Sequence, residues 1–377
     1  MNGRYRAAFI RGGTSKGLVF RIDELPADRA CWDNIFLSAM GSPDRYGRQL
    51  DGMGGGVSSL SKVCVVGPST TPDADVDYTF AQVQIRQAKV DYSGNCGNMS
   101  AAMGPYAMAE GMVPAPPDGL ACVRIHNTNT RKIIHSHFPV EGGVPCTEGS
   151  LEIPGVDGTG APVQLDFLNP GGASTGRLLP TGRVVDDLDI AGLGIVQASM
   201  VDAANACVFI SARSIGLRGT ELPDEIAAHP TALSHLQAVR LHASVAMGIA
   251  ASLDEARNIP VIPLIAVVAP AMESCTLDGE AIGSEAADLT VRMISSGQPH
   301  RALPLTGSLC SAVAMQIEGT IPNRMARAQR DAGALRLAMP SGVLTVAADV
   351  QCPPEGWHVA SGSFFRTTRR LFDGWVY

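Results

Sequence analysis

Cys96 has the surroundings of a reactive thiol. It stands in the segment Ser93-Gly94-Asn95-Cys96-Gly97-Asn98, immediately before a predicted helix. Unpaired backbone N–H groups and the positive end of the helix dipole favour a thiolate at such a position. The same N–H groups can hold a carboxylate, which makes Asn95, Gly97 and Asn98 candidate substrate contacts. A buried structural cysteine in a tight turn is the alternative interpretation, and the motif alone leaves both open.

Lys62 is the second candidate for chemistry. The chain has 25 Arg but only four Lys, and Lys62 ends the Gly/Ser-rich segment 51–62 where a predicted strand begins. A lysine shielded from water there could lose its proton near neutral pH and act as a general base. The segment lacks the GxxxxGK[ST] spacing of a phosphate-binding Walker loop. An exposed lysine at a strand end is the alternative, and glycine neighbours do not exclude it.

Two further segments have the composition of an anion cradle. The first is the turn 11–17, whose hydroxyls and backbone amides suit an anion. The second precedes and opens another predicted helix near residue 306. An ordinary glycine turn and a solvated loop are the respective alternatives. The candidate contacts are Thr14 and Ser15 in the first segment, and His300, Arg301, Thr306, Gly307 and Ser308 in the second.

The histidines and cysteines do not predict a metal centre or a disulfide framework. His135 and His137 would share one strand face with no Asp, Glu or Cys at ligand spacing, so a strand surface is the preferred interpretation. The nine cysteines are odd in number and form no CxxC pair. The first residues lack the apolar core of a signal peptide. We therefore expect a protein of the reducing cytoplasm.

Composition excludes several classes of protein. Hydrophobic residues make up 45% of the 377 residues and charged residues 17%, which excludes a disordered chain. The net charge is −7 and no Lys/Arg-rich block occurs, so no nucleic-acid partner is expected. The longest apolar run, residues 259–272, is interrupted by three prolines and is shorter than the ~20 residues of a membrane span. It predicts a buried strand instead, with no membrane partner.

Short apolar runs between Gly/Pro-rich turns predict an α+β protein with many strands and few helices. Predicted strands include residues 17–20, 63–66, 76–85, 123–126 and 343–350, and the tail 363–372 also has strand character. Predicted helices are residues 28–40, with Asp28 as N-cap, 98–112, 230–247 and 309–317. Pro105 should kink or split the second of these helices.

A weak internal repeat predicts two similar domains. Residues 14–20 resemble 203–209, and residues 96–102 resemble 306–312, in the same order along the chain. We expect a first domain of residues 1–184, joined by the C-terminal strand 360–377, and a second of residues 185–359. Two such domains facing each other would hold a ligand in the cleft between them.

Taken in order, these motifs resemble those of the 2-methylaconitate isomerase family, which includes 4-oxalomesaconate tautomerase and 3-methylitaconate isomerase. The resemblance spans nearly the whole chain. It rests on segments 11–17, 41–44, 51–55 with 61–62, 93–98, 179–182, 218–221, 306–308 and 366–375.

The resemblance implies a fold of the diaminopimelate epimerase type, with the active site between two similar halves. It implies a 1,3-allylic proton shift in an unsaturated di- or tricarboxylic acid, without cofactor or metal. Lys62 and Cys96 fall on the family's two catalytic positions, Lys62 as the base and Cys96 as a proton donor or an orienting group. The cradle residues and Asn205 would hold the substrate carboxylates and stabilise the dienolate charge.

Two alternatives to this function remain open. Amino-acid epimerases of this fold use a cysteine from each half, but this chain has Thr306 at the second place and Cys310 one helical turn further on. A racemase is therefore disfavoured. A non-catalytic protein that only binds a polycarboxylate is the other alternative, and the presence of both Lys62 and Cys96 argues against it. A homodimer is a common state for a soluble chain of this kind.

Overall fold

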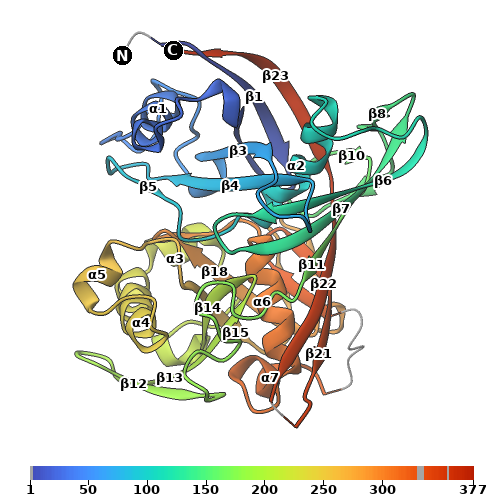
Figure 1. The fold of residues 1–377 in the computed structure, drawn as a ribbon. Coiled ribbons are helices and arrows are strands. Elements are labelled where there is room, and N and C mark those ends of the chain that lie inside the picture. Colours follow the sequence, from blue (N-terminus) through green and yellow to red (C-terminus); the bar gives the residue numbers. More distant parts are fainter. Residues whose placement is uncertain (1–2, 329–334, 355) are drawn as a thin grey trace. The chain divides into compact units, whose positions relative to one another are not determined.

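A computed structural model of the chain describes residues 3–328, 335–354 and 356–377. The chain forms two compact units (Figure 1). The first unit contains Met1–Phe167 and Phe364–Tyr377, and the second contains Leu168–Ser363. The sequence-based boundary between residues 184 and 185 falls inside the second unit, just before its first long strand.

The first unit is framed by a mixed sheet. Along it, β1 pairs antiparallel with β2, β2 parallel with β3, β3 antiparallel with β4, β4 parallel with β6, and β6 antiparallel with β7. β23, near the C-terminus, lies beside β1, and β11 lies beside β7. The bounds are β1 Tyr5–Gly12, β2 Ser15–Arg21, β3 Lys62–Pro68, β4 Val76–Val83, β5 Val90–Asp91, β6 Gly119–Asn127, β7 Lys132–Glu141, β8 Val144–Pro145, β11 Val163–Leu168 and β23 Thr368–Val376, with the small pair β9 Leu151–Glu152 and β10 Thr159–Gly160.

Helix α2, Gly97–Ala109, packs against strands of this sheet on all its sides, among them β1, β3, β4, β6 and β7. Its Ala- and Met-rich sequence is apolar all round, which is typical of a fully buried helix. Gly104 lets it approach β7 closely, since an added Cβ would lie 2.6 Å from Ser136 Oγ. The helix runs through Pro105 as one element, so of the two expected effects, a kink or a split, the split does not occur; close packing on every side offsets the cost of the missing N–H.

Helix α1, Trp32–Met40, covers a separate apolar cluster of the first unit. A short 3₁₀ turn, Arg29–Cys31, precedes it, and the Asp28 carboxylate accepts from the backbone N–H of Ala30, as predicted for an N-cap. Phe36 stacks on Phe20 of β2 with ring centroids 5.7 Å apart. Burial of each such side chain contributes about 1.5–3 kcal/mol, which fixes α1 on the sheet.

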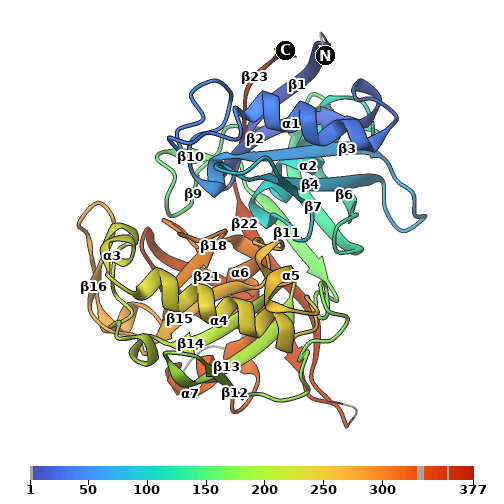
Figure 2. The same cartoon turned by 90° about the vertical axis from the view of Figure 1, so that its left-hand side faces the viewer.

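The second unit repeats this strand order. β13 pairs antiparallel with β14, β14 parallel with β15, β15 antiparallel with β18, β18 parallel with β20, and β20 antiparallel with β21 (Figure 2). β12 and β22 extend it beside β13 and β21. The bounds are β12 Asp186–Ile190, β13 Gly194–Ala203, β14 Asn205–Ser211, β15 Leu264–Ala269, β18 Leu289–Ser295, β19 Gln298–Pro299, β20 Leu335–Met339, β21 Gly342–Gln351 and β22 His358–Arg366, with the small pair β16 Ser274–Cys275 and β17 Ala281–Ile282.

The helices of the second unit follow the same plan. α6 occupies the place of α2, between β18 and β20 in the chain, and is buried along its whole length except at its last residue. It begins four residues before the predicted start, so the small residues 306–308 form its first turn. α4 matches the predicted helix 230–247 and covers a cluster that includes Met200 and Met247. The bounds are α3 Pro223–Ala228, α4 Ala232–Ala246, α5 Leu253–Arg257, α6 Leu305–Gln316 and α7 Ile321–Met325.

The predicted strands are present at or near their expected positions, and the predicted tail strand is two strands, β22 and β23, separated by Thr367. Two units of the same strand order, each with one fully buried helix, make an α+β fold of two similar halves. Within the residues that the structure describes, no helix combines the length and hydropathy that crossing a membrane requires.

Candidate active site

Lys62 is buried at the first position of β3. Lys62 is 7% exposed and pairs with Gly17 of the parallel strand β2. Gly17 is required there because a Cβ would lie 2.2 Å from the Lys62 carbonyl oxygen. The Lys62 ammonium donates to Gln82 Oε1 at 2.7 Å and lies 4.9 Å from the centre of the Phe80 ring. The amine is therefore held in one place by an amide oxygen and an aromatic face.

Gln82 is itself locked in orientation. Its Nε2 donates to the carbonyl oxygens of Ser58 at 3.1 Å and Ser61 at 2.9 Å, so only Oε1 is directed at Lys62. Gln82 lies directly opposite Lys62 in the antiparallel pair β3–β4. Its acceptor is uncharged. Lys62 is thus oriented by a hydrogen bond rather than by an ion pair.

The Gly/Ser-rich segment before Lys62 is organised by Gln49. The Gln49 Oε1 accepts from the Ser61 hydroxyl at 2.6 Å and from the backbone N–H of Gly56 at 3.0 Å, and its Nε2 donates to Ser42 Oγ at 2.9 Å. Gln49 is 1% exposed, and a Cβ on Gly54 would collide with it. These bonds fix the backbone immediately before Lys62.

Cys96 stands where the sequence predicts it, at the N-cap of α2. It has extended backbone angles, φ −114° and ψ 97°, and is 8% exposed. Its carbonyl oxygen accepts from the backbone N–H of Ser100 at 2.9 Å, from the Ser100 hydroxyl at 3.0 Å and from the Tyr78 hydroxyl at 3.5 Å. Cys96 therefore directly precedes a helix whose first backbone N–H groups have no partner within the helix.

Cys64 is buried on β3, two residues after Lys62. Burial raises the pKa of the Cys64 thiol; the Cys96 thiol raises it further, and the Lys62 ammonium lowers it. The Cys64 thiol donates to the Tyr78 hydroxyl at 3.7 Å, and this hydroxyl donates to the Cys96 carbonyl oxygen at 3.5 Å. Tyr78 therefore joins the strand that Lys62 begins to the start of α2.

The predicted cradle at Thr14 is joined to the start of α2. Asn98 Nδ2 donates to Thr14 Oγ1 at 3.0 Å, and Asn98 Oδ1 accepts from Arg366 Nε at 3.2 Å. Gly13 leaves room for this amide, because a Cβ there would lie 2.2 Å from Asn98 Oδ1. Ser15 is buried beside the same turn. The turn between β1 and β2 and the first turn of α2 therefore form one polar surface.

Asn95, just before Cys96, is also fixed in place. It is 5% exposed, and its Oδ1 accepts from Asn127 Nδ2 at 3.1 Å. Gly97 is buried as the first residue of α2. Both residues border the thiol as predicted.

Arg366 is a functional candidate that the sequence analysis did not assign to the site, although it is the first residue of the closing motif segment 366–375. Arg366 is 5% exposed, and burial lowers the pKa of its guanidinium to about 10. It donates to Asn98 Oδ1 and to the carbonyl of Phe365. Among the described residues it forms no ion pair with a carboxylate. A buried cation without a counter-charge, beside a helix N-terminus, is suited to an anionic ligand.

The second unit contains the matching surface without the lysine. Asn205 Nδ2, at the start of β14, donates to Thr306 Oγ1 in the first turn of α6 at 3.0 Å. Gly307 approaches Met293 closely, and the Ser308 hydroxyl donates to the Pro304 carbonyl. Where β3 begins with lysine, β15 begins with leucine. The repeat therefore duplicates the predicted cradle but not the predicted base.

Cys310 does not replace a second catalytic thiol in this surface. It is fully buried, and its thiol donates to the carbonyl of Val201 at 3.3 Å. Arg301, another predicted contact, is exposed and lies 4.0 Å from an Asp224 carboxylate oxygen. The backbone N–H of His300 donates to the Met293 carbonyl.

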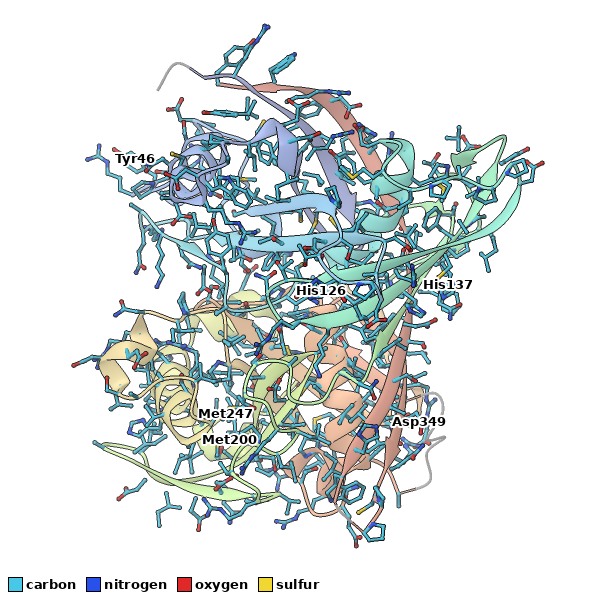
Figure 3. All side chains as sticks on the ribbon, viewed as in Figure 1. Tyr46, His126, His137, Met200, Met247 and Asp349 are labelled. Carbon is cyan, nitrogen blue, oxygen red and sulfur yellow. The ribbon has the colours of Figure 1, made fainter. Side chains whose placement is uncertain are left out.

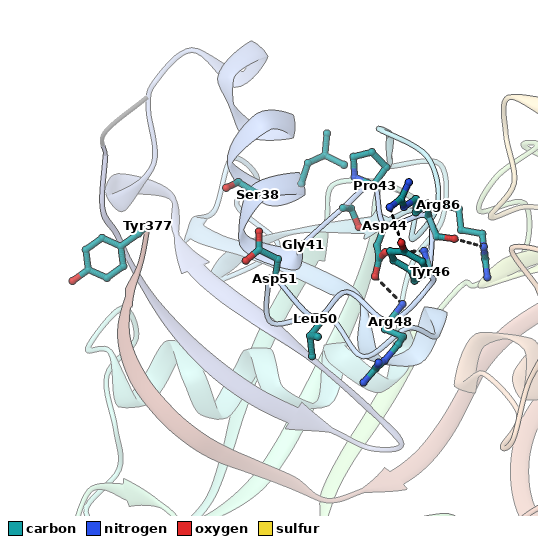
Figure 4. Close-up of a pocket in the computed structure, with 13 residues that line it drawn as sticks. Ser38, Gly41, Pro43, Asp44, Tyr46, Arg48, Leu50, Asp51, Arg86 and Tyr377 are labelled. Atoms are coloured by element: carbon teal, nitrogen blue, oxygen red, sulfur yellow. Dashed lines mark hydrogen bonds between the residues drawn. The ribbon is translucent and has the colours of Figure 1, made fainter.

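An open pocket of about 1010 Å³ lies on the first unit, beside the loop that follows α1 (Figure 4). Asp44 closes part of this loop by accepting from the backbone N–H groups of Tyr46 and Arg48. The pocket is lined by these residues together with Arg86 and Tyr377, and neither Lys62 nor Cys96 lines it. It is distinct from the candidate catalytic residues.

A cysteine and a carboxylate lie beside the two histidines of β7, contrary to the expectation from the sequence. The sequence suggests no Cys, Asp or Glu beside His135 and His137, but Cys122 lies directly opposite His137 across β6 and β7. The Asp166 carboxylate lies 3.2 Å from His137 Nε2. These partners come from strands whose register cannot be read from the sequence.

The sequence pattern of the PrpF protein family matches residues 3–377. The chain belongs to this family. It is 40% identical to a 3-methylitaconate isomerase of Eubacterium barkeri, over 99% of this chain and 97% of that protein. It is also 40% identical to a 2-methyl-aconitate isomerase of Cupriavidus necator, over 98% and 96% of the two chains.

Solved structures show the fold of the family. The crystal structure of a methylitaconate-delta-isomerase, 40% identical, superposes with a TM-score of 0.78 over 99% of this chain and 95% of that one. A hydroxyproline epimerase of Agrobacterium vitis is only 11% identical, yet gives a TM-score of 0.57 over 100% and 93% of the chains. The second likeness concerns the fold alone and confirms the predicted epimerase-like, α+β architecture.

Proposed function

We propose that this protein is an isomerase that moves a double bond in a small unsaturated di- or tricarboxylic acid by a 1,3-allylic proton shift. The relatives named above are isomerases of 3-methylitaconate and 2-methylaconitate, which support this substrate class. The observation that carries the proposal is the polar start of α2, where the Cys96 thiol and the buried Arg366 guanidinium, which contacts Asn98 and has no carboxylate partner among the described residues, lie in the same unit as the oriented amine of Lys62.

A substrate carboxylate would bind at the start of α2. Arg366 would supply a charge-assisted hydrogen bond, and the Thr14 hydroxyl and the first N–H groups of α2 would complete the cradle. Asn98 would act as the positioning residue, since it contacts both Thr14 and Arg366. Burial of these groups strengthens each electrostatic contact because little water screens it. Asn205, Thr306, Gly307 and Ser308 are proposed to bind a further polar group of the substrate.

Lys62 would act as the base in the proton shift. Its neutral amine takes a proton from the carbon next to the conjugated system, the C–H electron pair moves into a dienolate, and the double bond migrates by one position. A proton then returns to the distal carbon from the Lys62 ammonium or from the Cys96 thiol. The cradle stabilises the negative charge that spreads onto the carboxylate oxygens in between.

Cofactor requirement, location and assembly are proposed from the sequence and its resemblance to the family. The reaction would need neither a cofactor nor a metal ion. All proton transfers would take place among Lys62, Cys96 and the substrate. The protein would act in the cytoplasm, and a homodimer is the expected assembly.

Proton NMR in D₂O tests this function directly. Purified protein would be incubated with 2-methylaconitate, methylitaconate and 4-oxalomesaconate in turn. An isomer carrying solvent deuterium at the allylic carbon is expected from at least one of them, and Lys62→Met should abolish it. Line broadening without deuterium exchange would instead identify a binding protein, and exchange that is unchanged in Lys62→Met would refute the assignment of the base.

A further inference from the structure

One face of the β6–β7 pair gathers a cysteine and two histidines away from the candidate catalytic residues. Cys122 on β6 lies opposite His137 on β7, and His135 is two residues away on the same face. Figure 3 labels His137 on this face together with His126 of β6. One ligand atom from each of Cys122, His135 and His137 lies within 4.8 Å of the others. The three side chains come from two neighbouring strands that the sheet holds in fixed register.

The distances are close to those of a metal shell. A tetrahedral zinc ion, with bonds of about 2.3 Å to sulfur and about 2.0–2.1 Å to nitrogen, would separate its sulfur and nitrogen ligands by about 3.6 Å. The Cys122 thiol lies 3.9 Å from His137 Nε2. The His135 and His137 rings have centroids 6.2 Å apart. Small side-chain rotations would therefore be enough to close the shell.

A carboxylate lies beside the three ligands. Asp166 of β11 lies 3.2 Å from His137 Nε2, and it also accepts from Gln164 Nε2 at 2.9 Å. β11 pairs with β7, with Asp166 opposite His135 and Gln164 opposite His137. Because it faces the same ring nitrogen that would bind the ion, Asp166 can act on a bound ion from this place by direct ligation.

The surrounding charges suit a divalent cation. Arg124, opposite His135 on β6, is neutralised by Asp75, with Nη2 and Oδ1 2.6 Å apart. A Cys122 thiolate and the Asp166 carboxylate together carry two negative charges. A bound divalent ion would make this face electrically neutral.

We propose that Cys122, His135 and His137 form a binding site for a transition-metal ion of the Zn²⁺ class, with Asp166 as the adjoining carboxylate. Thiolate and imidazole donors select zinc, cobalt and related ions over Mg²⁺ or Ca²⁺, which prefer oxygen ligands. The bound ion would cross-link β6 and β7. The site is separate from Lys62 and Cys96, so it would stabilise the first unit without entering the proton shift.

Metal titration of the full chain, without a polyhistidine tag and after chelator treatment, tests the site. We expect one Zn²⁺ per chain and a higher melting temperature with Zn²⁺ than without it. Co²⁺ should give a thiolate-to-cobalt charge-transfer band. Cys122→Ser should remove that band, and Cys122→Ser or His137→Gln should weaken Zn²⁺ binding by at least about tenfold.

Two control variants keep this test specific. His126→Gln removes a histidine of the same strand face that is already paired with Asp77 at 2.9 Å, and Cys352→Ser removes another exposed cysteine. Both should bind Zn²⁺ as the wild type does. The proposal is overturned if the protein takes up no stoichiometric Zn²⁺, or if Cys122→Ser and His137→Gln bind no more weakly than the two controls. Circular dichroism of each variant excludes unfolding as the cause of a loss.

Discussion

Replacement of Lys62 by methionine is the most direct perturbation of the proposed mechanism. Methionine keeps an unbranched apolar stem against Phe80 and removes the amine that donates to Gln82. The variant should fold, because the main loss is one donor to a buried amide oxygen, which costs about 1–3 kcal/mol. Its effect on stability is thus much smaller than its effect on catalysis.

The expected catalytic loss follows from the role of the amine. A positioned general base contributes about 10²- to 10⁴-fold to the rate. At 1.36 kcal/mol per factor of ten, this corresponds to about 3–5 kcal/mol of transition-state stabilisation. We expect kcat to fall by that amount, with little change in KM because Lys62 is not assigned to carboxylate binding. Deuterium incorporation and isomer formation followed by NMR measure both quantities.

Two matched variants sharpen the comparison. Lys16→Met removes a lysine on the neighbouring strand β2, whose amine lies 5.6 Å from the Phe9 ring, and should retain most of the activity. Lys62→Arg keeps the positive charge but cannot supply a neutral base, so it should be as inactive as Lys62→Met. Wild-type turnover in Lys62→Met, or a larger loss in Lys16→Met, would refute the assignment.

Three further changes test other parts of the structure. Cys96→Ser should slow turnover by less than about 100-fold, the smallest rate contribution that is typical of a positioned proton-transfer group. A rate equal to that of the wild type would show that this thiol only packs in the structure. Gln82→Leu removes the acceptor of the Lys62 ammonium and one donor each from the Ser58 and Ser61 carbonyls, which keep the backbone N–H groups of Ser61 and Val83. Thermal unfolding should therefore show a loss of about 1–3 kcal/mol, together with lower kcat; unchanged values for both would show that Gln82 does not hold Lys62. Asp288 is buried, which opposes its charge, but the hydrogen bonds from Arg336 outweigh burial and hold its pKa below the usual value. Its stabilising effect is therefore present above about pH 4, near the pKa of an unfolded Asp, and disappears as pH falls through the lower folded value. Asp288→Asn should cost about 1.5–3 kcal/mol at pH 7 but much less near pH 2, and an equal cost in urea unfolding at both pH values would contradict this.

Local sequence patterns were enough to predict much of the fold. The alternation in residues 76–85 and the N-cap at Asp28 depend on neighbours in the chain, and both are present in the structure. The start of α6 was placed too late, because its first turn consists of small residues that are equally typical of a loop. Helix α2 continues past Pro105 because packing on all sides, which no local rule contains, stabilises it.

The residues of the candidate site were likewise only partly predictable from the sequence. Lys62 and Cys96 were found because glycine-rich turns mark them in the sequence. Gln82 was not, since only the register of β3 and β4 places it opposite Lys62. Arg366 meets Asn98 across 268 positions of the chain, and no pattern near either residue indicates that contact. The one signal in the sequence was the position of Arg366 as the first residue of the closing motif segment 366–375.

The membership of Arg366 and β23 in the first unit has a consequence for synthesis of the chain. Residues 364–377 leave the ribosome only after the whole second unit, about 200 residues later than the rest of the first. At roughly 5–20 residues per second this delay is on the order of 10–40 s. During that time one edge of β1 lacks the strand that covers it in the finished protein, and such an edge is open to pairing with other chains. The nascent chain therefore completes its second unit first, and the proposed carboxylate cradle, which includes Arg366, is assembled last.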